Sequence, residues 1–142
     1  MGLQRFHNSK SPYNFDLQGK TIIDIGGGAV SLLLKCVNLK AGMVIDPLPL
    51  PEWVKMRYKE ARIGFSNNPA EKPPVKKVKA DECWLYNCLQ HTQNPEAIIK
   101  NARKWGKLIR IFEWIDTSTN IGHPHSLSEV KLNEWLHGEG KV

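Results

Sequence analysis

The sequence predicts an α/β fold built around a mostly parallel sheet. Three observations support this prediction: short apolar runs recur along the chain, segments with helical spacing or helix-capping residues separate them, and the first run ends in three consecutive glycines. Strands that alternate with helices form parallel sheets with right-handed crossovers. The 142 residues correspond to one domain with enough chain for its own core.

Five apolar runs are expected to be the strands of this sheet. The run 83–86 is apolar throughout, as expected for a central parallel strand that is buried on both faces. Glycines, prolines and the pair Asp46-Pro47 stand beside several of the runs and mark where strands stop. The expected strands are 21–25, 43–45, 63–65, 83–86 and 107–114.

Four helices are expected between or after these strands. The clearest is 94–105, where Asn94 is a good N-cap, Pro95 suits the first helical position and Gly106 stops the helix. A capping box, Ser126-x-x-Glu129, predicts the start of the last helix. The other expected helices are the apolar stretch 29–37 after the glycines and the segment 52–61, and the apolar stripe expected on the last helix is Val130, Leu132, Trp135 and Leu136.

Composition and charge exclude several classes of protein. The three cysteines have no C-x-x-C spacing, so neither a disulfide framework nor a metal site is expected, and the pair His123 and His125 is weak evidence for one. No apolar run reaches the ~18 residues of a membrane span, and residues 1–20 hold no signal core. We therefore expect a soluble, cytoplasmic protein. The net charge of +6, concentrated in 72–79 and 100–110, does not by itself identify a partner.

The glycine turn at 26–28 is the most informative motif. Glycines between a first strand and a first helix let backbone N–H groups and the N-terminus of the helix approach a ligand closely. The dinucleotide pattern G-x-G-x-x-G fails here, because position 31 is Ser31. Asp24, inside the strand, would sit badly beside a pyrophosphate but can accept hydrogen bonds from an amine. The turn therefore favours a ligand that carries an amino acid, while a turn that serves only tight packing remains an alternative.

At these residues the sequence resembles class I S-adenosylmethionine-dependent methyltransferases. Asp24-Ile25-Gly26-Gly27-Gly28 is similar to their first motif, D/E-x-G-x-G-x-G, with Val30 in place of the last glycine. Further similar segments follow in the family's order: 43–47, 68–71, 81–91 and 94–107. The resemblance implies a Rossmann-like sheet of strand order 3-2-1-4-5. It divides the chain into a short N-terminal extension (1–19), a cofactor-binding core (20–116), and a loop with a C-terminal helix (117–142).

The resemblance also implies a binding site for S-adenosylmethionine. Asp46, about 20 residues beyond the glycines, would hold the ribose hydroxyls, and Asp24 would lie near the ammonium group. His91 is the candidate general base if the methyl acceptor must lose a proton, with a structural histidine as the alternative. The other residues implied in the cofactor site are Gly26, Gly28, Asn68, Ala70, Asn87 and Cys88.

The sequence limits the class of methyl acceptor only through the motifs that it lacks. The segment 87–90 lacks the Asn/Asp-Pro-Pro-aromatic motif of base-amino methyltransferases, and Cys88 does not follow a proline as in cytosine-C5 enzymes. A small-molecule acceptor is therefore expected, with nucleic acid as an alternative because of the positive charge. Glu113 and Asp116 are expected at the same rim, where they could contact the acceptor.

The chain departs from the family at both ends. The family's N-terminal helices are reduced to about 19 residues, and the usual terminal pair of antiparallel strands has no counterpart after the last helix. The fifth strand would then be an exposed edge, which a second copy or a partner subunit is expected to cover.

Two further functions stay open: a non-catalytic S-adenosylmethionine-binding module that needs a partner, and an NAD-linked oxidoreductase.

Overall fold

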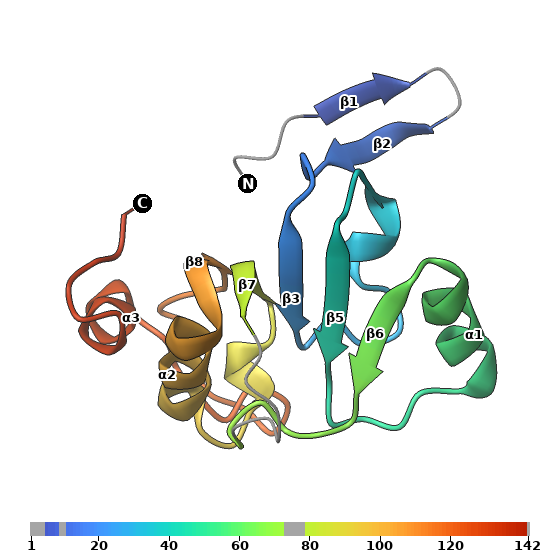
Figure 1. Ribbon diagram of the computed structural model, residues 1–142. Coiled ribbons are helices and arrows are strands. Elements are labelled where there is room, and N and C mark those ends of the chain that lie inside the picture. Colours follow the sequence, from blue (N-terminus) through green and yellow to red (C-terminus); the bar gives the residue numbers. More distant parts are fainter. Residues whose placement is uncertain (1–4, 9–10, 73–78, 142) are drawn as a thin grey trace.

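A five-stranded parallel sheet forms the centre of the molecule (Figure 1). The computed structural model describes residues 5–8, 11–72 and 79–141. The strand order is β6-β5-β3-β7-β8, which is the predicted order 3-2-1-4-5, so the predicted fold class is confirmed. The strands are β3 (Thr21–Ile25), β5 (Ala41–Ile45), β6 (Ile63–Ser66), β7 (Ala80–Tyr86) and β8 (Gly106–Phe112).

Helices α1 (Glu52–Glu60) and α2 (Pro95–Trp105) cover opposite faces of this sheet. The α2-side core joins Ile98, Ile99 and Ala102 to Ile23, Cys83 and Leu85, and the α1-side core joins Val54 and Tyr58 to Ile22, Val44 and Trp84. Successive strand residues point to opposite faces, which is why neighbours such as Ile22 and Ile23 belong to different cores. Helix α2 begins as predicted, since the Asn94 Oδ1 accepts a hydrogen bond from the Ala97 N–H at 3.0 Å.

The helix expected over 29–37 is absent, and this prediction was wrong. The segment forms one 3₁₀ turn, η1 (Leu32–Lys35), followed by the short strand β4 (Cys36–Val37). The Ser31 Oγ caps the turn by accepting from the Leu33 N–H, and Leu33 is buried in the α1-side core. Cys36 and Val37 then pair with a strand from the N-terminal part of the chain. A tertiary strand pairing therefore overrides the local helical spacing.

The residues treated as an N-terminal extension form β-structure. Strands β1 (Arg5–Asn8) and β2 (Ser11–Asp16) are antiparallel, and β2 pairs in parallel with β4 to give a second sheet of order β1-β2-β4. Leu17 follows directly and is buried in the α1-side core. In Figure 1 this hairpin stands above the amino ends of β3 and β5, away from their carboxyl ends.

The last helix, α3 (Glu129–Trp135), starts two residues later than the capping box predicted. Its N-cap is Ser128, whose Oγ accepts from the Lys131 N–H at 3.2 Å. Leu127, just before the cap, is buried, which fixes where the chain enters the helix. Of the predicted stripe, Leu132, Trp135 and Leu136 pack against the α2-side core, whereas Val130 is exposed.

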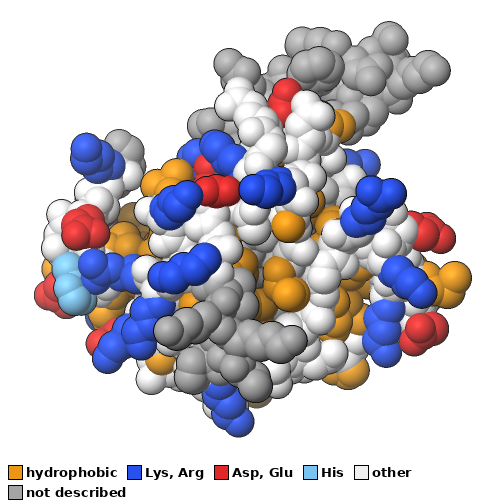
Figure 2. Space-filling model, in the orientation of Figure 1, with side chains coloured by type: hydrophobic (Ala, Val, Ile, Leu, Met, Phe, Trp, Pro, Cys, Tyr) orange, Lys and Arg blue, Asp and Glu red, His pale blue; other side chains and the backbone are white. Residues whose placement is uncertain are grey.

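Positive charge is spread over the face of the molecule that Figure 2 shows. On the face in Figure 2, lysine and arginine side chains lie over both α2 and α1, with acidic side chains among them. Of the basic stretch 72–79, residues 73–78 lie outside the described residues. Within the described ranges, no helix is long and apolar enough to cross a membrane.

Candidate functional site

A cavity of about 600 Å³ opens at the carboxyl ends of three adjacent strands. Gly26 directly follows β3, Asp46 follows β5 and Asn87 follows β7, and all three line it. In open α/β sheets, ligands bind in the crevice outside the carboxyl ends of the strands, where the strand order reverses. Here that point lies at β3, between β5 and β7. The remaining lining residues are Ile25, Ile45, Pro47, Leu48, Pro69, Ala70, Glu71, Lys72, Cys88, His91, Thr92, Gln93 and Ile98.

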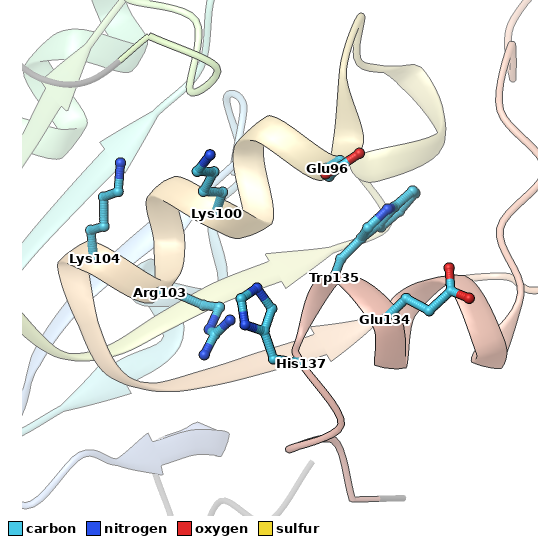
Figure 3. Close-up of a pocket in the computed structure, with 7 residues that line it drawn as sticks. All are labelled: Glu96, Lys100, Arg103, Lys104, Glu134, Trp135 and His137. Carbon is cyan, nitrogen blue, oxygen red and sulfur yellow. The ribbon is translucent and has the colours of Figure 1, made fainter.

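A second hollow of similar size, about 610 Å³, lies between α2 and α3 (Figure 3). It is lined by long charged side chains such as Lys100 and Arg103, and by Trp135 and His137 from α3 and its end. Arg103 is engaged with Glu139 at 3.4 Å. No strand end and no glycine turn in the described part of the chain contributes to this hollow. The cavity at the carboxyl ends of the strands is therefore the candidate site.

The glycine turn packs so tightly that side chains are excluded at two positions. Gly26 has a φ of +75°, and a Cβ there would overlap the Cys88 Cβ. A Cβ at Gly27 would overlap the Asp24 Oδ2. Gly28 has a φ of +53°, but a Cβ there would meet only the Asp46 Oδ2, at an ordinary contact distance of 3.7 Å. Gly26 therefore contributes backbone alone to the wall of the cavity, and its N–H donates to the Ile45 carbonyl at 2.8 Å.

Asp24 lies behind this turn and does not line the cavity. The residue is 3% exposed, and its carboxylate accepts a hydrogen bond from the Ser31 hydroxyl at 2.5 Å. Burial raises the pKa of Asp24 from 3.8 to about 6; the Ser31 hydroxyl acts against the rise and the charge of Asp46 adds to it. A buried carboxylate that is ionised only above about pH 6 thus lies beneath the turn.

Tyr58, on α1, holds the glycine turn in place through two hydrogen bonds. Its hydroxyl donates to the Gly28 carbonyl at 2.5 Å and accepts from the Ser31 N–H at 3.2 Å. Hydrogen bonds between Asp24 and Ser31 and between Ser31 and Tyr58 therefore join β3, the glycine turn and α1. Sequence reasoning missed Tyr58 entirely, and it noticed Ser31 only as the residue that breaks the dinucleotide pattern.

Asp46 both closes the turn and faces the cavity. Its Oδ2 accepts from the Gly28 N–H at 3.0 Å and its Oδ1 accepts from the Leu48 N–H at 2.9 Å. A carboxylate offers about four lone-pair positions, so each oxygen can accept one more hydrogen bond. The two backbone donors therefore fix the orientation of Asp46 and leave it able to bind a ligand with two hydroxyl groups.

Glu113 holds the turn after β7 in place, so one of its carboxylate oxygens is occupied by the chain itself. The Glu113 Oε1 accepts from the N–H groups of Cys88 and Leu89, at 2.8 and 2.9 Å. Burial raises the pKa of Glu113, while these two donors act in the opposite direction. Burial also raises the pKa of Cys88, which is therefore a neutral thiol. Asp116, which sequence reasoning placed at the same rim, is exposed and does not line the cavity.

His91 lies at the mouth of the cavity and is exposed. Its Nδ1 is 2.7 Å from the Gly122 carbonyl, which can only accept, so Nδ1 carries the proton and the neutral ring keeps its lone pair on Nε2. The ring of His123 lies over it, with 4.5 Å between centroids. His125 is turned to the Thr92 carbonyl instead. Across the described ranges, no three His, Cys, Asp or Glu side chains gather in a way that would hold a metal ion.

The structure thus brings together six of the nine predicted site residues. Of two others, Gly28 donates its N–H to the lining residue Asp46, and Asp24 lies next to Gly27, behind the turn. Asn68 is exposed and does not reach the cavity, although its neighbours Pro69 and Ala70 do. The six that line the cavity are Gly26, Asp46, Ala70, Asn87, Cys88 and His91.

Solved structures share this fold. The YcgJ protein from Bacillus subtilis matches with a TM-score of 0.68 at 12% identity, over 84% of this chain and 61% of that one. A SAM-dependent methyltransferase from Aquifex aeolicus matches with a TM-score of 0.65 at 18% identity, over 84% and 71%. The 1,6-didemethyltoxoflavin-N1-methyltransferase from Burkholderia thailandensis, with bound 1,6-didemethyltoxoflavin and S-adenosylhomocysteine, matches with a TM-score of 0.59 at 16% identity, over 84% and 59%.

The chain therefore has the fold of class I S-adenosylmethionine-dependent methyltransferases, and the resemblance seen in the sequence is confirmed at the level of the fold. It spans 61% and 59% of the length of the Bacillus and Burkholderia structures. No protein-family model matches the sequence, and no curated protein matches it significantly.

Proposed function

We propose that the chain binds S-adenosylmethionine in the cavity at the carboxyl ends of β3, β5 and β7 and transfers its methyl group to a small-molecule acceptor. The single observation that carries the proposal is the convergence of a glycine turn, Asp46 and Asn87 on one cavity of about 600 Å³. Many ligand pockets have volumes of about 300 to 1,000 Å³. A nucleoside that carries an amino acid fits within that range.

The residues present suit the chemical groups of this cofactor. The two oxygens of Asp46 each have a free acceptor position, which matches the two hydroxyls of a ribose. The wall at Gly26 leaves no Cβ between the backbone and the amino-acid end. Ala70 and Ile98 supply apolar lining of the kind that an adenine ring contacts. The ionised form of Asp24 would attract the ammonium group across the turn.

The cofactor would supply an electrophilic methyl carbon, and the chain has to position the acceptor and remove its proton. Asn87 and Cys88 line the cavity at the end of β7, where Glu113 holds the backbone of this turn in place. His91 presents Nε2 as the basic nitrogen because the Gly122 carbonyl holds the proton on Nδ1. We infer that His91 accepts the proton that an acceptor loses as it is methylated.

A small-molecule acceptor is supported by the Burkholderia neighbour, whose bound 1,6-didemethyltoxoflavin is a small molecule. On the face seen in Figure 2 the basic side chains are spread over several elements, whereas a nucleic-acid footprint gathers them into a patch or stripe. The acceptor itself is therefore proposed only as a small molecule with a protonated nitrogen or oxygen nucleophile.

Isothermal titration calorimetry tests the cofactor. S-adenosylmethionine and S-adenosylhomocysteine should bind to the purified chain, and NAD should not. Asp46→Asn should weaken binding by about tenfold or more, because one charged acceptor is lost. The matched control is Asp116→Asn, an exposed position outside the cavity, which should bind like the wild type. Absence of binding by both sulfur nucleosides would refute the proposal.

Calorimetry measures binding alone, so methyl transfer has to be measured in a separate activity assay. His91→Gln should lower the rate of methyl transfer to an acceptor while leaving the affinity for S-adenosylhomocysteine within about twofold. An equal loss of rate and affinity would show that His91 serves the fold or the cofactor. Binding of the cofactor without transfer to any acceptor in a small-molecule panel would favour a non-catalytic binding module.

A further inference from the structure

Strand β8 is an uncovered edge of the central sheet. It pairs with β7 on one side, and no other strand in the described part of the chain pairs with its outer side. Its residues keep an unbroken register with β7 from Gly106 to Phe112, and the strand contains no proline. Proteins usually protect such edges with prolines, bulges, charges or covering elements, because an open edge invites pairing with another chain.

One face of this edge also carries exposed apolar side chains. Leu108 and Phe112 are 45% and 61% exposed, and with Tyr86 they line a hollow of about 270 Å³, to which Lys141 near the end of the chain also contributes. Between them lies Arg110, whose Nε and Nη2 donate to the Glu82 carboxylate at 2.7 and 3.3 Å. Arg110 is therefore paired within the chain, with a carboxylate that also binds Lys20 at 2.8 Å.

The main-chain groups available for a new strand can be assigned from one hydrogen bond. The Phe112 carbonyl accepts from the Asn87 N–H at 2.7 Å, on the β7 side. Successive residues of a strand direct their main-chain groups to opposite edges. Lys107, Ile109 and Ile111 therefore direct their N–H and C=O groups away from β7.

The sequence of this edge is complementary to itself when reversed. Reading outward from Arg110 along 108–112, Ile109 mirrors Ile111 and Leu108 mirrors Phe112. An antiparallel strand from a second copy, centred on Arg110, would thus place Ile109 opposite Ile111 and Leu108 opposite Phe112, so that apolar residues face apolar residues. A two-fold symmetric interface requires this kind of self-complementarity.

We propose that two copies of this chain associate through antiparallel pairing of their β8 strands, centred on Arg110, to form one continuous ten-stranded sheet. Ile109 and Ile111 of opposite copies form hydrogen-bonded pairs, since their main-chain groups point outward. Leu108 and Phe112 form the closer, non-hydrogen-bonded pairs. The two Arg110 side chains meet at the symmetry axis, where each is held by its own Glu82. The interface does not depend on methyl transfer.

The register can be tested by charge pairing. Leu108→Lys and Phe112→Glu each place a charge opposite an apolar side chain, and each should weaken dimerisation about tenfold or more. In the double variant every Lys at position 108 faces a Glu at position 112 of the other copy, so dimerisation should recover. The control is Val130→Lys, which charges an exposed apolar position on α3, outside β8.

Analytical ultracentrifugation of the full chain over the micromolar range provides the readout. The wild type and the control should sediment at twice the 16.1 kDa of one chain, the single variants at lower mass, and the double variant again as a dimer. Thermal denaturation of each variant identifies any that fails to fold. A wild-type monomer throughout this range would overturn the proposal. Single variants that remain dimeric, or a folded double variant that stays monomeric, would overturn the register.

Discussion

Replacing Asp24 by asparagine should change how the stability of the protein depends on pH. Asp24 is 3% exposed beneath the glycine turn, and burial raises its pKa to about 6. In the unfolded chain the same carboxyl has a pKa near 3.8. The folded state therefore holds the proton more tightly than the unfolded state does.

The sign and the size of the effect follow from this difference. The stabilising contribution of protonated Asp24 is fully present below pH 3.8 and is lost as the pH rises through about 6. One pKa unit corresponds to about 1.4 kcal/mol, so the total loss is about 3 kcal/mol. The asparagine side chain of the Asp24→Asn variant cannot ionise, so the variant shows no such loss. Relative to this variant, the wild type should become less stable by about that amount between about pH 3.5 and pH 7.5.

Urea denaturation of both proteins at a series of pH values measures this difference. Carboxyl groups far from Asp24 titrate alike in both proteins, so their contributions cancel when the two free energies of unfolding are subtracted. The effect of the Asp46 charge on Asp24 is part of the measured difference. The Asp116→Asn variant, changed at an exposed position, should track the wild type. A difference between wild type and Asp24→Asn that stays constant with pH would refute the argument that burial raises this pKa.

Three further predictions concern the turn and the amino end of the sheet. Gly26→Ala should cost more unfolding free energy in urea than Gly19→Ala, although both residues have φ of +75°, because only the Cβ at 26 meets another residue. Tyr58→Phe should cost about 1 to 2 kcal/mol in the same assay and weaken calorimetric binding of S-adenosylhomocysteine, since the bond to the Gly28 carbonyl is lost. Burial acts to raise the pKa of Glu82, but its hydrogen bonds, chiefly from Arg110, lower it to about 2. The wild type should therefore be more stable than Glu82→Gln above pH 4.5, and this advantage should disappear as the pH falls through 2 in acid titrations.

The strands of the central sheet could be predicted because their signals are local. Buried parallel strands appear as short apolar runs, and residues that cannot continue a strand or helix, such as Gly26 and Pro47, mark their ends. The order of the strands came from the resemblance to a known fold, not from any run by itself. The cavity residues that directly follow strands were predictable for the same reason, since carboxyl ends of parallel strands meet at one edge.

The helix expected after the glycine turn shows where local signals fail. Leucines at helical spacing predicted it, but Cys36 and Val37 pair with residues of β2 that lie about twenty positions earlier in the chain. A helical pattern carries no information about such a partner. The absence of Asn68 from the cavity has a similar origin, because a shift of one or two positions along a loop decides which side chain faces inward.

The sequence by itself therefore determined the parallel sheet, the glycine turn and the carboxylate of Asp46 at the end of the second core strand. Only the tertiary structure decided what surrounds them: Tyr58 from α1 against the turn, Glu113 holding the backbone after β7, and Ser31 on the buried Asp24. Strand and turn preferences act between neighbours in the chain, whereas burial and hydrogen bonding act between residues that only folding brings together.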